Sequence, residues 1–61
     1  GLEQYYELFR RLGAKDAEDE AFFLAAFLDG ILLGKSTRGE KYPMAAMKEK
    51  MKEFIKNRYP R

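Results

Sequence analysis

The chain has 61 residues, no cysteine and no histidine, and a formal net charge of +2 at pH 7. Such a length forms one small domain, which buries only about 60% of the surface of its unfolded chain. The composition excludes disulfide bonds, iron–sulfur clusters and thiolate zinc sites, and it lacks the commonest metal ligand and general base. Association with a second chain is the remaining way to stabilise so small a scaffold. The lack of cysteine fits a reducing compartment, and we expect the cytoplasm.

The charges are divided unevenly along the chain. Residues 1–34 carry three basic and seven acidic side chains, a net charge of −4, whereas residues 35–61 carry nine basic and three acidic ones, a net charge of +6. A basic half can indicate a nucleic-acid or membrane partner. Lysines that alternate with Glu49 and Glu53 are more typical of a solvated helix face. We expect no membrane span, because no apolar run approaches roughly 20 residues, and no signal peptide is recognisable.

Apolar residues at spacings of three and four predict an amphipathic helix over about residues 2–12. Gly13 suits its end, because glycine adopts the left-handed conformation that often follows a last turn. A second helix is predicted over about residues 17–33, with Asp16 as its N-cap and Asp19 completing a variant of the capping box. Gly34 is expected to end this helix.

A polar connection follows, and Pro43 is expected at the first position of a third helix over about residues 43–57. No strand pattern and no internal repeat competes with this assignment. The sequence therefore predicts an all-α chain of three helices that forms a single helical domain or fragment over residues 1–61. The apolar stripe of the third helix consists of Met44, Met47, Met51 and Phe54, widened by Ile55.

The second helix is apolar nearly all round, so it must be buried on more than one side. At 100° per residue it divides into two unlike faces. The bulky face consists of Phe23, Leu24, Phe27, Leu28 and Ile31, and the opposite, small face of Ala25, Ala26, Asp29 and Gly30, flanked by Phe22, Leu32 and Leu33.

Two other helices can cover only the bulky face, so the small face is expected to admit a second copy of the chain. Ala26, Gly30 and Gly34 stand four apart, which permits close approach of a helix. We expect a homodimer in which the second and third helices of two chains form a four-helix bundle. The predicted interface consists of Phe22, Ala26, Asp29, Gly30, Leu33, Gly34, Met44, Met47, Met51 and Phe54.

Asp29 is the one carboxylate within the apolar run, and it has two interpretations. A metal or acid–base site would need a second acid, but the neighbouring turns supply only alanine and leucine. A buried carboxylate costs several kcal/mol without hydrogen-bond donors. We therefore expect Asp29 to accept hydrogen bonds near the interface, and we expect no catalytic residue, no metal, no cofactor and no enzyme activity.

The segment Phe27-Leu28-Asp29-Gly30-Ile31-Leu32-Leu33 resembles the "LLDGL" element in the C-terminal domain of TetR/AcrR-type transcriptional regulators. The context is similar too, from a helix that ends in Phe9-Arg10-Arg11-Leu12-Gly13 to a Tyr42-Pro43 entry into a last amphipathic helix. The resemblance covers roughly residues 2–59. It implies a four-helix dimer interface formed by the last two long helices.

The same resemblance implies a DNA-binding helix-turn-helix and an effector pocket elsewhere in such a regulator. Neither lies within these residues, because the helix after the only suitable turn is too apolar for a DNA groove. DNA binding would therefore belong to a part outside this chain. A small-molecule effector remains an option, with Tyr5, Tyr6, Phe9 and Phe23 as candidates for lining its pocket and core packing as their alternative role.

Two other functions stay open at this point. The basic rear half and the apolar second helix would suit a cationic peptide that acts at membranes, although the caps and turn glycines indicate a folded globule. A small nucleic-acid-binding module is the other alternative. Its candidate residues would be Lys48, Lys50, Lys52, Lys56, Arg58 and Arg61.

Overall fold

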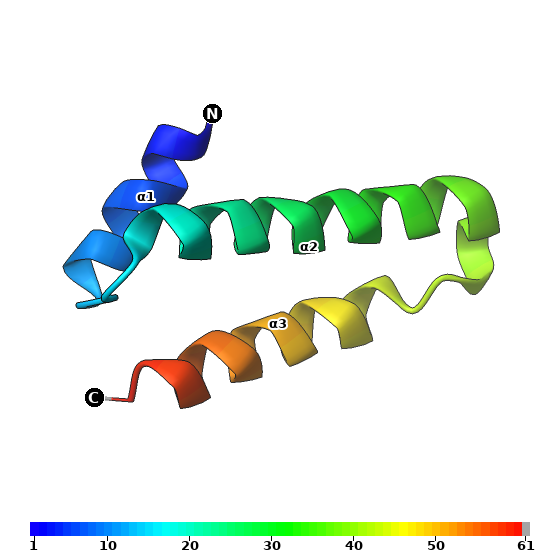
Figure 1. The fold of residues 1–61 in the computed structure, drawn as a ribbon. Coiled ribbons are helices and arrows are strands. Elements are labelled where there is room, and N and C mark those ends of the chain that lie inside the picture. Colours follow the sequence, from blue (N-terminus) through cyan, green and yellow to red (C-terminus); the bar gives the residue numbers. More distant parts are fainter. Residues whose placement is uncertain (61) are drawn as a thin grey trace.

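The computed structural model describes residues 1–60, which form three α-helices, a short 3-10 helix and no strand. Helix α1 spans Leu2–Arg11, α2 spans Ala17–Arg38, the 3-10 helix η1 spans Gly39–Lys41, and α3 spans Met44–Arg58. Figure 1 shows α2 as the long central helix, with α1 against its first half and α3 running back beside it in the opposite direction. The all-helical prediction is confirmed.

The connection between α1 and α2 follows the local signals of the sequence. Gly13 has φ of 85°, a left-handed conformation that a side chain would strain. Asp16 is the N-cap of α2, and its Oδ1 accepts a hydrogen bond from the backbone N–H of Asp19 at 3.1 Å. A hydrogen bond between the Asp16 and Asp19 side chains and the negative charge of Asp16 raise the pKa of the Asp19 carboxyl. The predicted end of α1 at Gly13 and the predicted N-cap of α2 at Asp16 are confirmed.

The cap makes a first prediction. Replacing Asp16 with alanine leaves a backbone N–H of the first turn of α2 without its acceptor, which should lower the free energy of unfolding by about 1 kcal/mol. Thermal unfolding followed by circular dichroism measures this loss. Asp16→Asn is the matched control, because asparagine keeps a capping oxygen. An equal loss in both variants would contradict the capping role.

The predicted end of α2 is wrong. The helix continues past Gly34 to Arg38, and Gly39, with φ of 61°, is its C-cap. The ring of Tyr42 occupies the space where a Cβ of residue 34 would stand. Gly34 therefore leaves room for the Tyr42 ring and does not end the helix. The expected polar connection is largely helical. Pro43 caps α3 instead of occupying its first turn.

The fully buried core is small. The buried apolar residues within residues 1–60 are Phe9, Ala21, Leu24 and Ile31. Among them, Phe9 is the largest side chain and is only 2% exposed. The Cα atoms extend over 36 × 24 × 13 Å. Within residues 1–60, α2 is contacted by α1, η1 and α3, which leaves part of its circumference open.

Two long-range contacts hold the end of α3 near the start of α2, and a third joins the C-cap residue of α3 to α1. Arg58 Nε donates to Glu20 Oε1 at 2.7 Å, and the two side chains form an ion pair that raises the pKa of Arg58. The rings of Phe23 and Phe54 lie 5.5 Å apart between centroids, a tilted arrangement typical of aromatic pairs. The Phe9 ring lies 5.7 Å from that of Tyr59 between centroids.

No helix within residues 1–60 combines the length and the hydropathy of a membrane span.

Candidate association surface

One side of α2 faces solvent along its whole length. We call it the outward stripe and define it as Phe22, Ala26, Asp29, Gly30 and Leu33, all of which are exposed. Phe22 is 55% exposed and Leu33 64% exposed. On the opposite side, Leu24 and Ile31 are buried. The expected division of this helix between an inward bulky face and an open small face is therefore present only in part, because Phe23 of the bulky face is 50% exposed.

No contact within the described chain requires a glycine at position 30. A Cβ built at this residue would meet nothing within 4 Å. Glycine in the interior of a helix costs about 1 kcal/mol relative to alanine. Gly34 differs, because the Tyr42 ring of the same chain already lies against it. Of the two glycines, Gly30 alone is free to admit a neighbouring helix.

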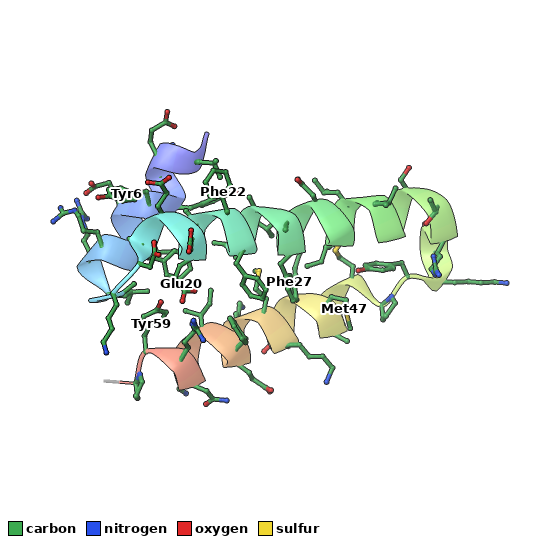
Figure 2. The ribbon with its side chains drawn as sticks, in the orientation of Figure 1. Tyr6, Glu20, Phe22, Phe27, Met47 and Tyr59 are labelled. Carbon is green, nitrogen blue, oxygen red and sulfur yellow. The ribbon has the colours of Figure 1, made fainter. Side chains whose placement is uncertain are left out.

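A groove between α1 and α2 borders the first half of the outward stripe. It has a volume of about 490 Å³ and apolar walls that include Leu2, Tyr6 and Phe22. Figure 2 shows Tyr6 and Phe22 on the side of α2 that points away from α3. Local sequence patterns do not reveal this groove, because it depends on where α1 crosses α2. Three carboxylates also line it, those of Glu3, Glu7 and Glu18.

Glu7, on the α1 side of this groove, is paired with a neighbouring arginine of the same helix. Arg10 donates two hydrogen bonds to Glu7, Nε to Oε1 at 3.2 Å and Nη2 to Oε2 at 3.0 Å. These bonds and the positive charge of Arg10 lower the pKa of Glu7. Both side chains are exposed, so the pair contributes little to folding stability.

Asp29, a member of the outward stripe, also lines a second groove, which lies between α2 and α3. This groove has a volume of about 460 Å³, and Lys48 and Lys52 share its lining with Asp29. Asp29 is exposed in the single chain. Lysine ammonium groups are donors of the kind expected for this carboxylate if a second chain covers it.

The predicted interface residues of α3 lie elsewhere. Met44, Met47 and Met51 are half-buried, and Figure 2 shows Met47 and Phe27 in the space between α3 and α2. Phe54 packs on Phe23. The apolar stripe of α3 therefore packs on α2 of the same chain. The outward stripe of α2 remains as the candidate association surface.

The four aromatic residues considered for an effector pocket do not share one surface. Tyr6 lines the groove between α1 and α2, whereas Tyr5 lines the groove between α2 and α3. Phe9 is buried in the core and contacts Tyr59. Phe23 is half-exposed beside Phe54. Core packing accounts for Phe9, and helix pairing accounts for Phe23.

Three basic residues of α3, Lys48, Lys52 and Lys56, stand four apart along one side of the helix, whereas Lys50 and Arg58 lie on other sides. Lys52 Nζ lies 3.5 Å from Glu49 Oε1, and Arg58 is paired with Glu20, so two of the candidate phosphate ligands already have acidic partners. Arg61, the last of the candidates, lies outside the described residues.

Comparison of the chain with known protein families, with curated proteins and with solved structures found no match.

Proposed function

We propose that this chain is a self-association module, in which the outward stripe of α2 pairs with the same stripe of a second copy. The observation that carries the proposal is the exposure of Phe22 and Leu33 on a helix face that also holds Gly30 in open space. Burying a Phe or Leu side chain contributes about 1.5–3 kcal/mol. A symmetric dimer would bury two copies of Phe22 and two copies of Leu33, one from each chain. Gly30 would let the two helix backbones approach.

The resemblance to TetR/AcrR-type regulators suggests the setting of this module. We propose that it serves as the dimerisation segment of such a transcriptional regulator. DNA contacts would then come from a part outside this chain, because the exposed face of α2 presents Phe22 and Leu33 rather than polar side chains that read bases. The order of the elements and the exposed stripe support this proposal. A small-molecule effector would belong to the same larger regulator.

Sedimentation velocity at micromolar concentration tests the association. The chain should sediment as a dimer, and Gly30→Leu should weaken dimerisation by at least about tenfold, equivalent to 1.4 kcal/mol, because the added side chain separates the two helices. Lys50→Leu is the matched control, since it adds the same side chain at an exposed position of α3. A monomeric parent chain, or a Gly30→Leu variant that dimerises as well as the control, would overturn the proposal.

A further inference from the structure

We infer that the two copies of α2 pair antiparallel, in a register that places Phe22 of one chain against Leu33 of the other, with α1 forming a second part of the contact. This inference rests on the proposed self-association and adds its orientation and register. Three observations on the exposed side of the molecule carry it: the symmetry of the stripe, the charges at the two ends of α2, and the groove beside Phe22.

Six of the exposed positions along α2 stand at spacings of three, four, three, four and three, which is the pattern of a two-helix seam, with Gly30 beside it. They are symmetric about the point between Ala26 and Asp29. An antiparallel copy therefore sets Phe22 against Leu33 and Ala26 against Asp29. A parallel copy would set every position against itself and would bring two Asp29 carboxylates together. The seam positions are Asp19, Phe22, Ala26, Asp29, Leu33 and Ser36, all exposed.

The charges of α2 favour the same orientation. Its first turn is acidic, with Glu18, Asp19 and Glu20, and its last turn is basic, with Lys35 and Arg38. Antiparallel copies bring the acidic end of each helix to the basic end of the other, twice per dimer, with Lys35 and Arg38 on the side of α2 that carries Leu24 and Ile31. The attraction is therefore between the helix ends as a whole, since Lys35 already pairs with Glu40 and Glu20 with Arg58 in the same chain. Parallel copies would bring like charges together at both ends. Charges of this kind act over about 8 Å at physiological ionic strength, so the ends of two packed helices interact.

The groove between α1 and α2 lies where this register needs a receiving surface. Phe22 forms one wall of the groove and Tyr6, 41% exposed, lies on the α1 side. The Leu33 side chain of the second copy would cover Phe22 there. The basic last turn of its α2 would lie near Glu18, whereas Glu7 on the α1 side already pairs with Arg10. Helix α1 thereby extends the contact beyond the α2 seam.

Disulfide trapping distinguishes the two orientations, because the chain has no cysteine of its own. Phe22→Cys and Leu33→Cys are made as separate chains and mixed in a thiol–disulfide buffer. Positions 22 and 33 are about 16 Å apart along one helix, at about 1.5 Å per residue, which is too far for a disulfide to bridge the wrong register. Cross-links between the two variants should predominate several-fold over those within either variant. Lys50→Cys on α3 is the control for random collision.

Asp19→Cys mixed with Ser36→Cys is the second pair, which removes no apolar side chain from the seam and so retains the test if Phe22→Cys weakens association. A Phe22→Cys chain that cross-links mainly to itself would overturn the antiparallel inference while leaving the proposed self-association intact. A dimer whose pairs all cross-link no better than the Lys50→Cys control would also overturn the inference. A monomer in sedimentation would overturn the proposed function together with the inference.

Discussion

Replacing Phe9 with alanine is expected to remove most of the folding stability, which leaves a substantial fraction of the chains unfolded. Phe9 is the largest fully buried side chain within residues 1–60, and its ring contacts both the core and Tyr59 of the distant C-terminal end. Truncation of a buried phenylalanine to alanine costs about 3–5 kcal/mol through lost burial and the cavity left behind. Proteins are typically stable by only about 5–15 kcal/mol, and a domain of this size lies near the lower end. The loss is therefore comparable with the whole stability.

Far-UV circular dichroism during thermal and urea unfolding measures this effect. The adjacent Leu8 supplies the control, because it is 41% exposed and Leu8→Ala should cost well under half as much. Each variant is compared over a range of concentrations, since dimerisation itself raises the unfolding temperature. Equal losses for Phe9→Ala and Leu8→Ala would show that α1 does not dock through Phe9.

The parts of the fold that the sequence predicted correctly depend on short-range interactions. Asp16 caps the N–H of Asp19, three residues away, and Gly13 ends α1 through its own backbone conformation. The inward face of α2 was likewise predictable, because helical periodicity alone sets which residues share a side with Leu24 and Ile31. Each of these signals lies within one or two turns of helix, so it can be read without the fold.

The remaining features depend on residues far apart in the sequence. Gly34 would end a helix or accept a close contact with equal ease, and only the position of Tyr42 decides between the two. The ion pair of Arg58 with Glu20 joins residues 38 positions apart, and no pattern marks either of them as a partner. The apolar stripe of α3 likewise shows that Met47 needs a covering surface, but not whether that surface belongs to the same chain.

Gly34→Ala and Gly30→Ala should change stability in opposite directions, although both make the same chemical change within one helix. In the single chain, at concentrations below those at which it associates, alanine at residue 30 enters open space and gains up to about 1 kcal/mol of helix propensity. In a domain of this size that gain raises the unfolding temperature by about 4–8 °C. Alanine at residue 34 collides with the ring of Tyr42, which must move out of its site. Overpacking of this kind costs about 1–3 kcal/mol, which outweighs the gain in propensity.

The cause of the loss at Gly34 is tested by repeating the substitution in a Tyr42→Ala chain. Removing the ring destabilises the connection between α2 and α3, but it also frees the space that the new methyl group needs. Gly34→Ala should then stabilise the chain, so its effect changes sign between the two backgrounds. Thermal unfolding of the four chains completes a double-mutant cycle, and a coupling energy of at least about 1 kcal/mol is expected for residues in contact. An equal loss in both backgrounds would mean that Gly34 is required for its backbone freedom, as a helix terminator is, rather than for the contact with Tyr42.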